Sequence, residues 1–384
     1  MEDEPVVIPP GKGRLYLLGV FTLGLALPRA PALLNIDGSR NQLFVFGSVA
    51  FAYNSNVFSD YTNRADYTIT ADAGVDLKRR AGIIAVNATV KVDYVRYGKY
   101  SDENAVNPGF YIEFNKTTGR TTGAITINAF RESRADSAVN LRTSSWNFPL
   151  GLSLKYPVND KFYVTSSTSY LQRRYPASTA LANYTDYTEG LDLFYVYTSK
   201  LDLVGGYRIR VSRTSIGNNT TDHWFNVGAT GGLLAKLSGS IRLGYQIRET
   251  SGSGGENFAQ VNASGSLSWP VTRKLGLSGS INRDFNTIAT GASVDSTGVA
   301  LRATYAFTRK IEFGSGVGYG RNKFLARDQP PRTDDFFSFD VSAHYKMNEQ
   351  LSLGASYTYF RNSSNISFSQ FDRQGFSFDI ASRY

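Results

Sequence analysis

The sequence predicts an all-β chain, closed into a transmembrane antiparallel up-and-down β-barrel of about 18 strands (range about 16 to 18). Composition is the first of three observations: 36 Gly, 24 Tyr and 25 Phe, no cysteine, and no long helical pattern. Second, apolar and polar residues alternate from about Gln42 onward, which is the period of a β-strand. Third, short turns and long polar loops follow each other in alternation, as in a hairpin repeat.

The amino-terminal residues carry the pattern of an export segment. An apolar run at residues 15–27 follows two basic residues and precedes the small residues around Ala32, as in a signal peptide. We therefore expect residues 1–32 to be an export segment, 33–41 a short periplasmic segment and 42–384 the barrel. The acidic start MEDE is unusual for a signal peptide, and an uncleaved amphipathic β-segment is the alternative. No apolar run reaches the roughly 18 residues of a transmembrane helix.

Two kinds of connection divide the remainder of the chain. Short turns are expected at 157–161, 271–274, 307–310 and 346–350. Long loops are expected at 97–109, 173–186, 213–223 and 321–335. Extending this pattern gives about eighteen strands, nine long loops and eight short turns, with both termini at the short-turn end, the layout of a bacterial outer-membrane barrel.

The two faces of each strand differ in chemistry. Around residues 69–78 one face carries Ile69, Ala71, Ala73, Val75 and Leu77, and the other carries Thr70, Asp72, Gly74, Asp76 and Lys78. An apolar outer face suits lipid, where every sheet edge must be closed. Aromatic residues near the strand ends fit interfacial girdles: Trp146, Tyr156, Trp269, Tyr319, Tyr345 and Tyr359. Pro149 lies inside a strand, where we expect a bulge or a local irregularity.

Two sequence features resemble a known family. FAYNSNVFSD at residues 51–60, together with the strand ends YLQRRY, YRIRVSR, YQIRET and YTYFRN, resembles the β-barrel porins often encoded with exopolysaccharide genes in Gram-negative bacteria. The resemblance implies an outer-membrane location and is compatible with polysaccharide export. It supplies no functional residues, and no cofactor is expected.

Charged residues at inward positions are the candidate pore lining. The cations are Arg208, Arg210, Arg242 and Arg302, and the acids are Asp72, Asp76, Asp340 and Asp379. Because the last strand pairs with the first, the acids should form one arc and the arginines should face them from the opposite wall. Opposed charges would impose a transverse field on passing solutes. The alternative is that inward charges only pair with their neighbours.

Small inward residues and basic loop ends bear on the lumen and its mouth. Gly314, Gly316, Gly318 and Gly320 line one strand and suggest an open lumen, unless a loop folds in. Arginines begin several long loops: Arg131, Arg173, Arg213, Arg248, Arg283, Arg321 and Arg361. They could bind lipopolysaccharide phosphates or extend to the interface. The formal charge of +9 comes without a basic cluster interleaved with aromatics, so nucleic acid is not an expected partner.

Catalysis is the weakest functional hypothesis. Asp340, Ser342 and His344 share an inward face, but a spacing of two residues separates side chains by about 6.5 to 7 Å along a strand. His223, the other histidine, is expected in a loop. We therefore predict no enzyme, and rank a channel for hydrophilic solutes or saccharides first. A plugged surface barrel that binds lipopolysaccharide or capsule is second, and an outer-membrane hydrolase third.

The carboxyl-terminal strand resembles the signal read by the barrel-assembly machinery. Phe376, Phe378, Ile380 and Tyr384 share one face and the chain ends on an aromatic. Ser382 departs from the apolar residue usual two places before the end. We expect this strand to close the sheet and to carry the assembly signal.

Overall fold

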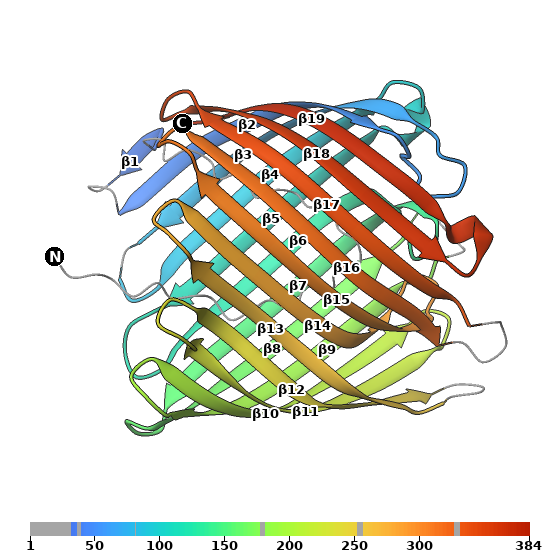
Figure 1. The fold of residues 1–384 in the computed structure, drawn as a ribbon. Helices are drawn as coiled ribbons and strands as arrows, with labels where there is room; N and C mark the ends of the chain where they lie inside the picture. Colours follow the sequence, from blue (N-terminus) through green and yellow to red (C-terminus); the bar gives the residue numbers. More distant parts are fainter. Residues whose placement is uncertain (1–31, 37–39, 81, 177–180, 252–255, 326–330) are drawn as a thin grey trace.

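The computed structural model describes residues 32–36, 40–80, 82–176, 181–251, 256–325 and 331–384. Its strands form one closed antiparallel barrel, in which each strand from β2 to β19 pairs with the next and β19 pairs with β2 (Figure 1). The predicted barrel of eighteen strands is confirmed. The expected export segment lies almost wholly outside the described residues.

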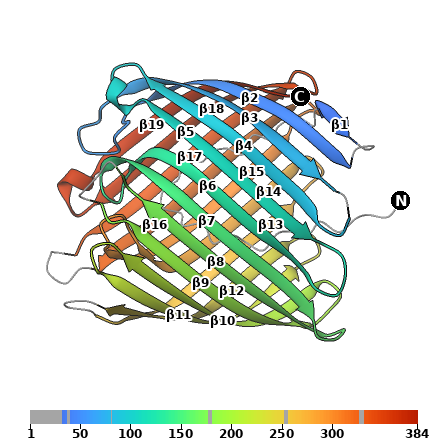
Figure 2. The same ribbon diagram turned by 180° about the vertical axis from the view of Figure 1, so that it is seen from behind.

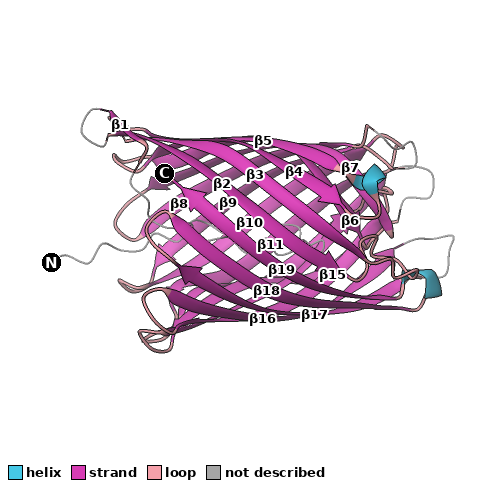
Figure 3. Cartoon of the chain, turned by 90° about the horizontal axis from the view of Figure 1, so that it is seen from above, coloured by secondary structure: helices cyan, strands magenta, loops and turns pink. Residues whose placement is uncertain are grey.

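The strands are long and strongly tilted (Figures 1 and 2). They are β1 (Leu34–Ile36), β2 (Asn41–Asn54), β3 (Asp66–Arg79), β4 (Ala85–Tyr97), β5 (Ala105–Lys116), β6 (Thr122–Asp136), β7 (Leu141–Pro157), β8 (Phe162–Arg174), β9 (Tyr184–Val196), β10 (Leu201–Thr214), β11 (Asn219–Gly232), β12 (Ser238–Ser251), β13 (Phe258–Pro270), β14 (Leu275–Thr287), β15 (Ser293–Ala306), β16 (Ile311–Leu325), β17 (Thr333–Lys346), β18 (Leu351–Ser364) and β19 (Phe371–Arg383). Two single 3₁₀ turns, η1 (Ser101–Glu103) and η2 (Ser367–Ser369), lie at the loop end (Figure 3). Among the described residues, no helix is long and apolar enough to cross a membrane.

The seam of the barrel joins the two ends of the chain. β19 pairs with β2 from Gly375 opposite Asn54 to Arg383 opposite Phe46. The terminal residue Tyr384 continues this ladder, because its N–H and its carbonyl both bond to the main chain of Val45, at 2.8 and 2.7 Å. The carboxyl terminus is therefore part of the sheet, as its alternating pattern predicts. β1, which the pattern did not predict, adds a short pairing to the start of β2.

The connections segregate by end. The described strands are joined by eight short turns at the end that holds the carboxyl terminus and by nine loops at the other (Figure 1). Several loops are shorter than expected, because the strands continue beyond the apolar band: β5 already begins at Ala105 and β11 at Asn219. The placement of His223 in a loop is therefore wrong, since it lies in β11.

The outward face is apolar, as the alternation predicts. Ile69, Val75 and Leu77 are 49, 40 and 42 % exposed on β3, where they face the bilayer rather than a protein core. Pro149 causes the expected irregularity: β6 and β7 pair up to Ile127–Leu150 and again from Phe130–Asn147, but not between. The register is the same on both sides, so the ladder is interrupted and no residue is bulged out.

Candidate functional site

Three inward side chains from neighbouring strands form a buried ion cluster. Asp222 on β11 lies directly opposite Arg210 on β10 and Arg248 on β12 in the strand register. Its two carboxylate oxygens accept from Arg210 Nη2 and Arg248 Nε, each at 2.6 Å. Asp222 and Arg248 are fully buried. A carboxylate with two guanidinium partners is satisfied in such a setting, whereas a single buried charge would not be.

The ion cluster holds the hairpin between β14 and β15 inside the barrel. Arg248 Nη1 donates to the carbonyl of Asn286 at 3.1 Å and to the hydroxyl of Ser293 at 3.0 Å, and Arg210 donates to the carbonyl of Phe285. Pairing between β13 and β14 stops at Arg283, although β14 continues to Thr287. Phe285 is only 2 % exposed at a position that alternation assigns to the outer face. The hairpin has therefore left the wall.

The tip of this hairpin completes a small apolar core in the mouth of the barrel. Ile288 packs with Ala138 and Phe324, and Ala289 packs with Tyr175 and other residues of the β8–β9 loop. The N–H of Ala182 donates to the carbonyl of Ala289 at 2.7 Å. Side chains from three connections and from the end of β16 thus meet where the sequence left open whether any loop folds inward.

The β6–β7 loop crosses the mouth to the far wall. Its Ala138 shares an apolar cluster with Phe324 of β16, and β7 and β16 lie nine strands apart in the ring of eighteen. Arg332 donates to the carbonyls of Ala138 and Ser137 at 2.8 and 3.1 Å. Asn140 accepts from the hydroxyl of Ser369 at 2.8 Å. We call this assembly of the β6–β7, β8–β9, β14–β15, β16–β17 and β18–β19 connections the mouth cap. It narrows the end that is extracellular in outer-membrane barrels.

Five of the eight predicted pore-lining residues form ion pairs on their own side of the barrel. The pairs are Arg210–Asp222 at 2.6 Å, Arg242–Asp192 at 2.9 Å, Arg302–Asp340 at 3.4 Å and Arg383–Asp76 at 2.7 Å. Arg302 and Asp340 lie only two strands apart, so the expected opposition across the lumen does not hold for this pair. These five residues therefore follow the alternative interpretation, in which inward charges only pair with their neighbours.

Three predicted residues remain without an ion-pair partner among the described residues. Arg208 on β10 stacks its guanidinium 4.1 Å from the centre of the Trp224 ring, and its Nε finds no acceptor. Asp379 on β19 keeps one buried carboxylate oxygen without a donor. Asp72 on β3 accepts a hydrogen bond from the hydroxyl of Ser48. β10 and β19 lie nine strands apart, so these charges belong to opposite walls. Their role in lining a pore stays a prediction.

The cluster residues Asp222 and Arg248 were missed as inward site residues, although the sequence carries a usable signal. Arg210, Asp222 and Arg248 occupy inward positions of three consecutive strands, and short turn and loop lengths place them in one row. What the sequence does not carry is the inward turn of the β14–β15 hairpin, which buries the row.

The glycines of β16 leave space that neighbouring side chains occupy, so they do not by themselves widen the lumen. A Cβ on Gly316 would lie 2.4 Å from a carboxylate oxygen of Asp340, and one on Gly320 would lie 2.2 Å from the Phe336 ring. Both neighbours belong to β17 and lie flat across the stripe. Gly316 sits directly between Arg302 and Asp340 in the register, so the ion pair passes over it.

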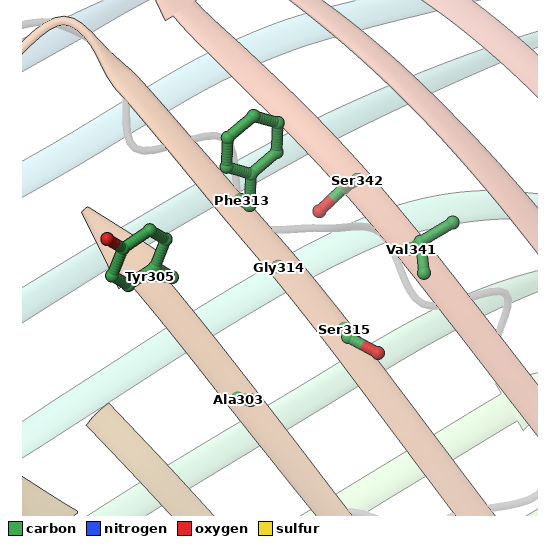
Figure 4. A pocket seen from close by; sticks show the side chains of 7 residues that line it. All are labelled: Ala303, Tyr305, Phe313, Gly314, Ser315, Val341 and Ser342. Atoms are coloured by element: carbon green, nitrogen blue, oxygen red, sulfur yellow. The ribbon is translucent and has the colours of Figure 1, made fainter. Parts of the chain in front are cut away.

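The inward stripe of Asp340, Ser342 and His344 shows no catalytic contacts within the described residues. The Ser342 hydroxyl has no hydrogen-bond partner, and Asp340 is engaged by Arg302. A pocket of about 260 Å³ lies beside it, lined by Tyr305, Phe313 and Val341 with small residues between them (Figure 4). These three side chains are outward and partly exposed, so the pocket is an apolar hollow in the barrel surface.

The arginines near the loops separate into two groups. Arg173 and Arg248 point inward, and Arg173 donates to Asn147 at 2.5 Å. Arg283, Arg321 and Arg361 point outward and pair with acids of the adjacent strand: Asp295 at 3.0 Å, Asp335 at 2.6 Å and Asp372 at 3.7 Å. Exposed pairs of this kind contribute little stability.

Comparison with known proteins identifies the barrel. Residues 207–384 match the family model described as "Putative beta-barrel porin 2". No curated protein sequence matched the chain. Among solved structures, Pseudomonas aeruginosa OpdK with vanillate is similar at TM-score 0.51 and 9% identity, covering 89% of this chain and 99% of that chain. Pseudomonas aeruginosa OpdQ is similar at 0.51 and 10%, covering 90% and 98%, and OpdL of the same organism at 0.50 and 10%, also covering 90% and 98%.

At these identities the solved structures establish the fold alone, and the family match covers the carboxyl-terminal part of the chain. Together with the closed barrel, its apolar belt and its segregated turns and loops, these findings confirm the resemblance seen in the sequence. This chain is a β-barrel protein of the bacterial outer membrane, and its residues 207–384 relate it to the β-barrel porins.

Proposed function

We propose that this barrel is a channel for small hydrophilic solutes, with selectivity set by the charges that local ion pairs leave over. The observation that carries the proposal is the placement of Arg208 on β10 and of Asp379 and Asp72 on the opposite wall, none of them with an ion-pair partner among the described residues. Charges of opposite sign on facing walls produce a transverse field, which favours charged and dipolar solutes over apolar ones.

Planar-bilayer conductance tests this function. The folded protein should give ohmic single-channel steps, and Arg208→Ser should move the reversal potential in a salt gradient toward cation selectivity. Arg208→Lys keeps the charge and is the matched control, so its reversal potential should stay near that of the unmodified protein. Absence of steps from folded, reconstituted protein would refute the channel. An unchanged reversal potential in Arg208→Ser would refute the role of the charge.

A second function is a plugged surface barrel whose loops bind lipopolysaccharide or capsule. The mouth cap favours it, because an apolar core across the mouth obstructs flow. The outward Arg174 and Arg213 line a second pocket of about 260 Å³ at the loop end and offer cations to lipid phosphates. The two functions differ in conductance: a plugged barrel conducts only after the cap is loosened, as by Arg248→Ala. Binding of purified lipopolysaccharide that is lost in the Arg174→Ser, Arg213→Ser double variant would support the surface function.

Passage of saccharide chains is the finer form of the channel proposal, and the resemblance to porins encoded with exopolysaccharide genes supports it. Liposome swelling with neutral saccharides of increasing size measures the largest saccharide that passes through the barrel. The mouth cap predicts a low size limit that rises when the β14–β15 hairpin is released. A limit that is unaffected by Arg248→Ala would place the narrowest point elsewhere in the barrel.

A further inference from the structure

One side of β13 is left without a partner strand near the loop end. Pairing between β13 and β14 stops at Ala263 opposite Arg283, but β13 itself begins five residues earlier, at Phe258. Residues 258–262 pair with β12 on one side, and no other strand of the described chain pairs with their β14 side. We call these five residues the free edge. An unpaired strand edge is a template on which another strand can pair.

The end of β14 has the length and the alternation to fit the free edge. It continues for four residues past Arg283. If the register of the wall continued, Phe285 would lie opposite Val261 on the outer face. The same outward row already holds Phe225 of β11 and Tyr245 of β12, which are 54 and 48 % exposed. Phe285 would extend this aromatic row, whereas in the structure it is turned inward and buried.

In the structure, side chains take the place of the free edge as partners of β14. The N–H of Phe285 donates to Gln246 Oε1 at 3.4 Å, and its carbonyl accepts from Arg210. A strand residue that pairs through hydrogen bonds presents its N–H and its carbonyl to the same neighbour. The main-chain groups that would bind the free edge are therefore occupied by side chains of β12 and β10, and the two arrangements exclude each other.

We propose that the β14–β15 hairpin is a two-state gate, which docks on the ion cluster when closed and pairs with the free edge of β13 when open. Switches of this kind depend on two discrete packings of one element. The closed state has the arginines and the apolar contacts of the mouth cap. The open state has the main-chain pairing that the free edge lacks, and it moves the hairpin from the lumen into the wall. β15 moves with β14, because the two strands pair as far as Thr287 opposite Ser293.

A disulfide across the free edge reports the open state. Val261 is outward and 58 % exposed, whereas Phe285 is inward and buried, so cysteines at these two positions lie on opposite faces of the wall when the hairpin is docked. In the open state they are directly opposite, with Cα atoms about 5.5 Å apart, which suits a disulfide. The chain has no cysteine of its own. Ala263→Cys with Arg283→Cys is the matched control, because these residues are already paired.

Val261→Cys with Phe285→Cys should form the disulfide under mild oxidation, at least about tenfold faster when Arg248→Ala is added, since that change removes two hydrogen bonds of the closed state. If no disulfide forms in the Arg248→Ala protein while the control pair closes, the hairpin does not reach the free edge. Equal rates with and without Arg248 would mean that the ion cluster does not hold the closed state. Either result overturns the proposal.

Hydrogen exchange tests the same switch without cysteines. In Arg248→Ala the amide of Val261 should exchange at least about twofold more slowly, because it gains Phe285 as a partner; an unchanged rate would mean release without pairing and would overturn the proposal.

Conductance rests on the proposed channel function and is read separately. The disulfide should raise the single-channel conductance until a reductant is added, and equal conductance before and after reduction would overturn the hairpin as a gate. A disulfide that forms in folded barrels without any conductance steps would refute the channel function and support the two hairpin states.

Discussion

Removing Arg248 should release the β14–β15 hairpin from the ion cluster, while Asp222 in that cluster keeps one of its two arginine partners. In Arg248→Ala, Asp222 keeps its 2.6 Å contact with Arg210, so no buried carboxylate is left unpaired. The hairpin loses two hydrogen bonds, to the carbonyl of Asn286 and to the hydroxyl of Ser293. Hydrogen bonds from a charged donor contribute about 1.5–3 kcal/mol each, so the closed hairpin is destabilised by about 3–6 kcal/mol.

Each 1.4 kcal/mol corresponds to about a tenfold change in an equilibrium constant, so the opened population should rise about 10²- to 10⁴-fold. Hydrogen exchange measures this at the amide of Ala182, which donates to the carbonyl of Ala289 in the hairpin tip and loses that acceptor when the hairpin moves away. Ser293→Ala removes one of the two contacts and should give a smaller loss of protection. Single-channel conductance should increase in parallel, because the hairpin occupies the mouth.

The control is Arg361→Ala, which removes an exposed guanidinium 3.7 Å from Asp372 on the outer rim. It should leave both exchange and conductance unchanged, because exposed pairs contribute little. The reasoning is refuted if protection in Arg248→Ala stays within about tenfold of the unmodified protein, since the apolar contacts of the mouth cap would then hold the hairpin without the arginine.

Two further predictions concern the wall and a loop. Gly316→Ala should lower the free energy of unfolding by about 1–3 kcal/mol, because a Cβ at this position would displace Asp340 from Arg302. The change should be seen as a lower transition temperature on heat-modifiability gels. Gly298 is the control, since it is an inward glycine whose Cβ would meet nothing within 4 Å; Gly298→Ala should have little effect, and equal shifts in both variants would contradict the close-approach argument. In the β2–β3 loop, burial acts to raise the pKa of Asp60, but hydrogen bonds from Thr62 and Arg64 outweigh it and hold the pKa below its usual range. A lowered pKa in the folded state means that this stabilisation is present above the unfolded value of about 3.9 and is lost as pH falls below it, so the loop should become protease-sensitive in acid. Asp60→Asn should abolish that pH dependence, and an unchanged acid response in this variant would contradict the assignment.

The barrel could be predicted because both of its determinants, the alternation along each strand and the turns between strands, are local features of the sequence. Alternation with period two assigns every residue of β3 to lipid or lumen, and the turns mark where a strand reverses. Once strand number and parity are known, closure follows, since lipid leaves no edge unpaired. Besides the short strand β1, the loop boundaries were misjudged. Strands such as β11 continue past the apolar band, where polar residues on both faces hide the alternation, and this is why His223 was assigned to a loop.

The site was predictable in part. Parity correctly identifies Arg208, Arg210 and Arg242 as inward, but parity does not say which charge lies within reach of which. Arg302 meets Asp340 because Gly316 lets both side chains cross one strand, a contact between residues 38 positions apart in sequence. Local pairing therefore engages five of the eight predicted charges and leaves Arg208, Asp379 and Asp72 without an ion-pair partner among the described residues.

The sequence by itself determined the barrel, its outward and inward faces, and the strand at which it closes. Those properties depend on neighbours two residues apart and on the chemistry of lipid. Only the tertiary structure decided that the β14–β15 hairpin turns inward, and that the β6–β7 connection meets Arg332 from the far side of the barrel. Such contacts join residues from distant strands across an enclosed space, where position depends on the register of the whole sheet and not on any local pattern.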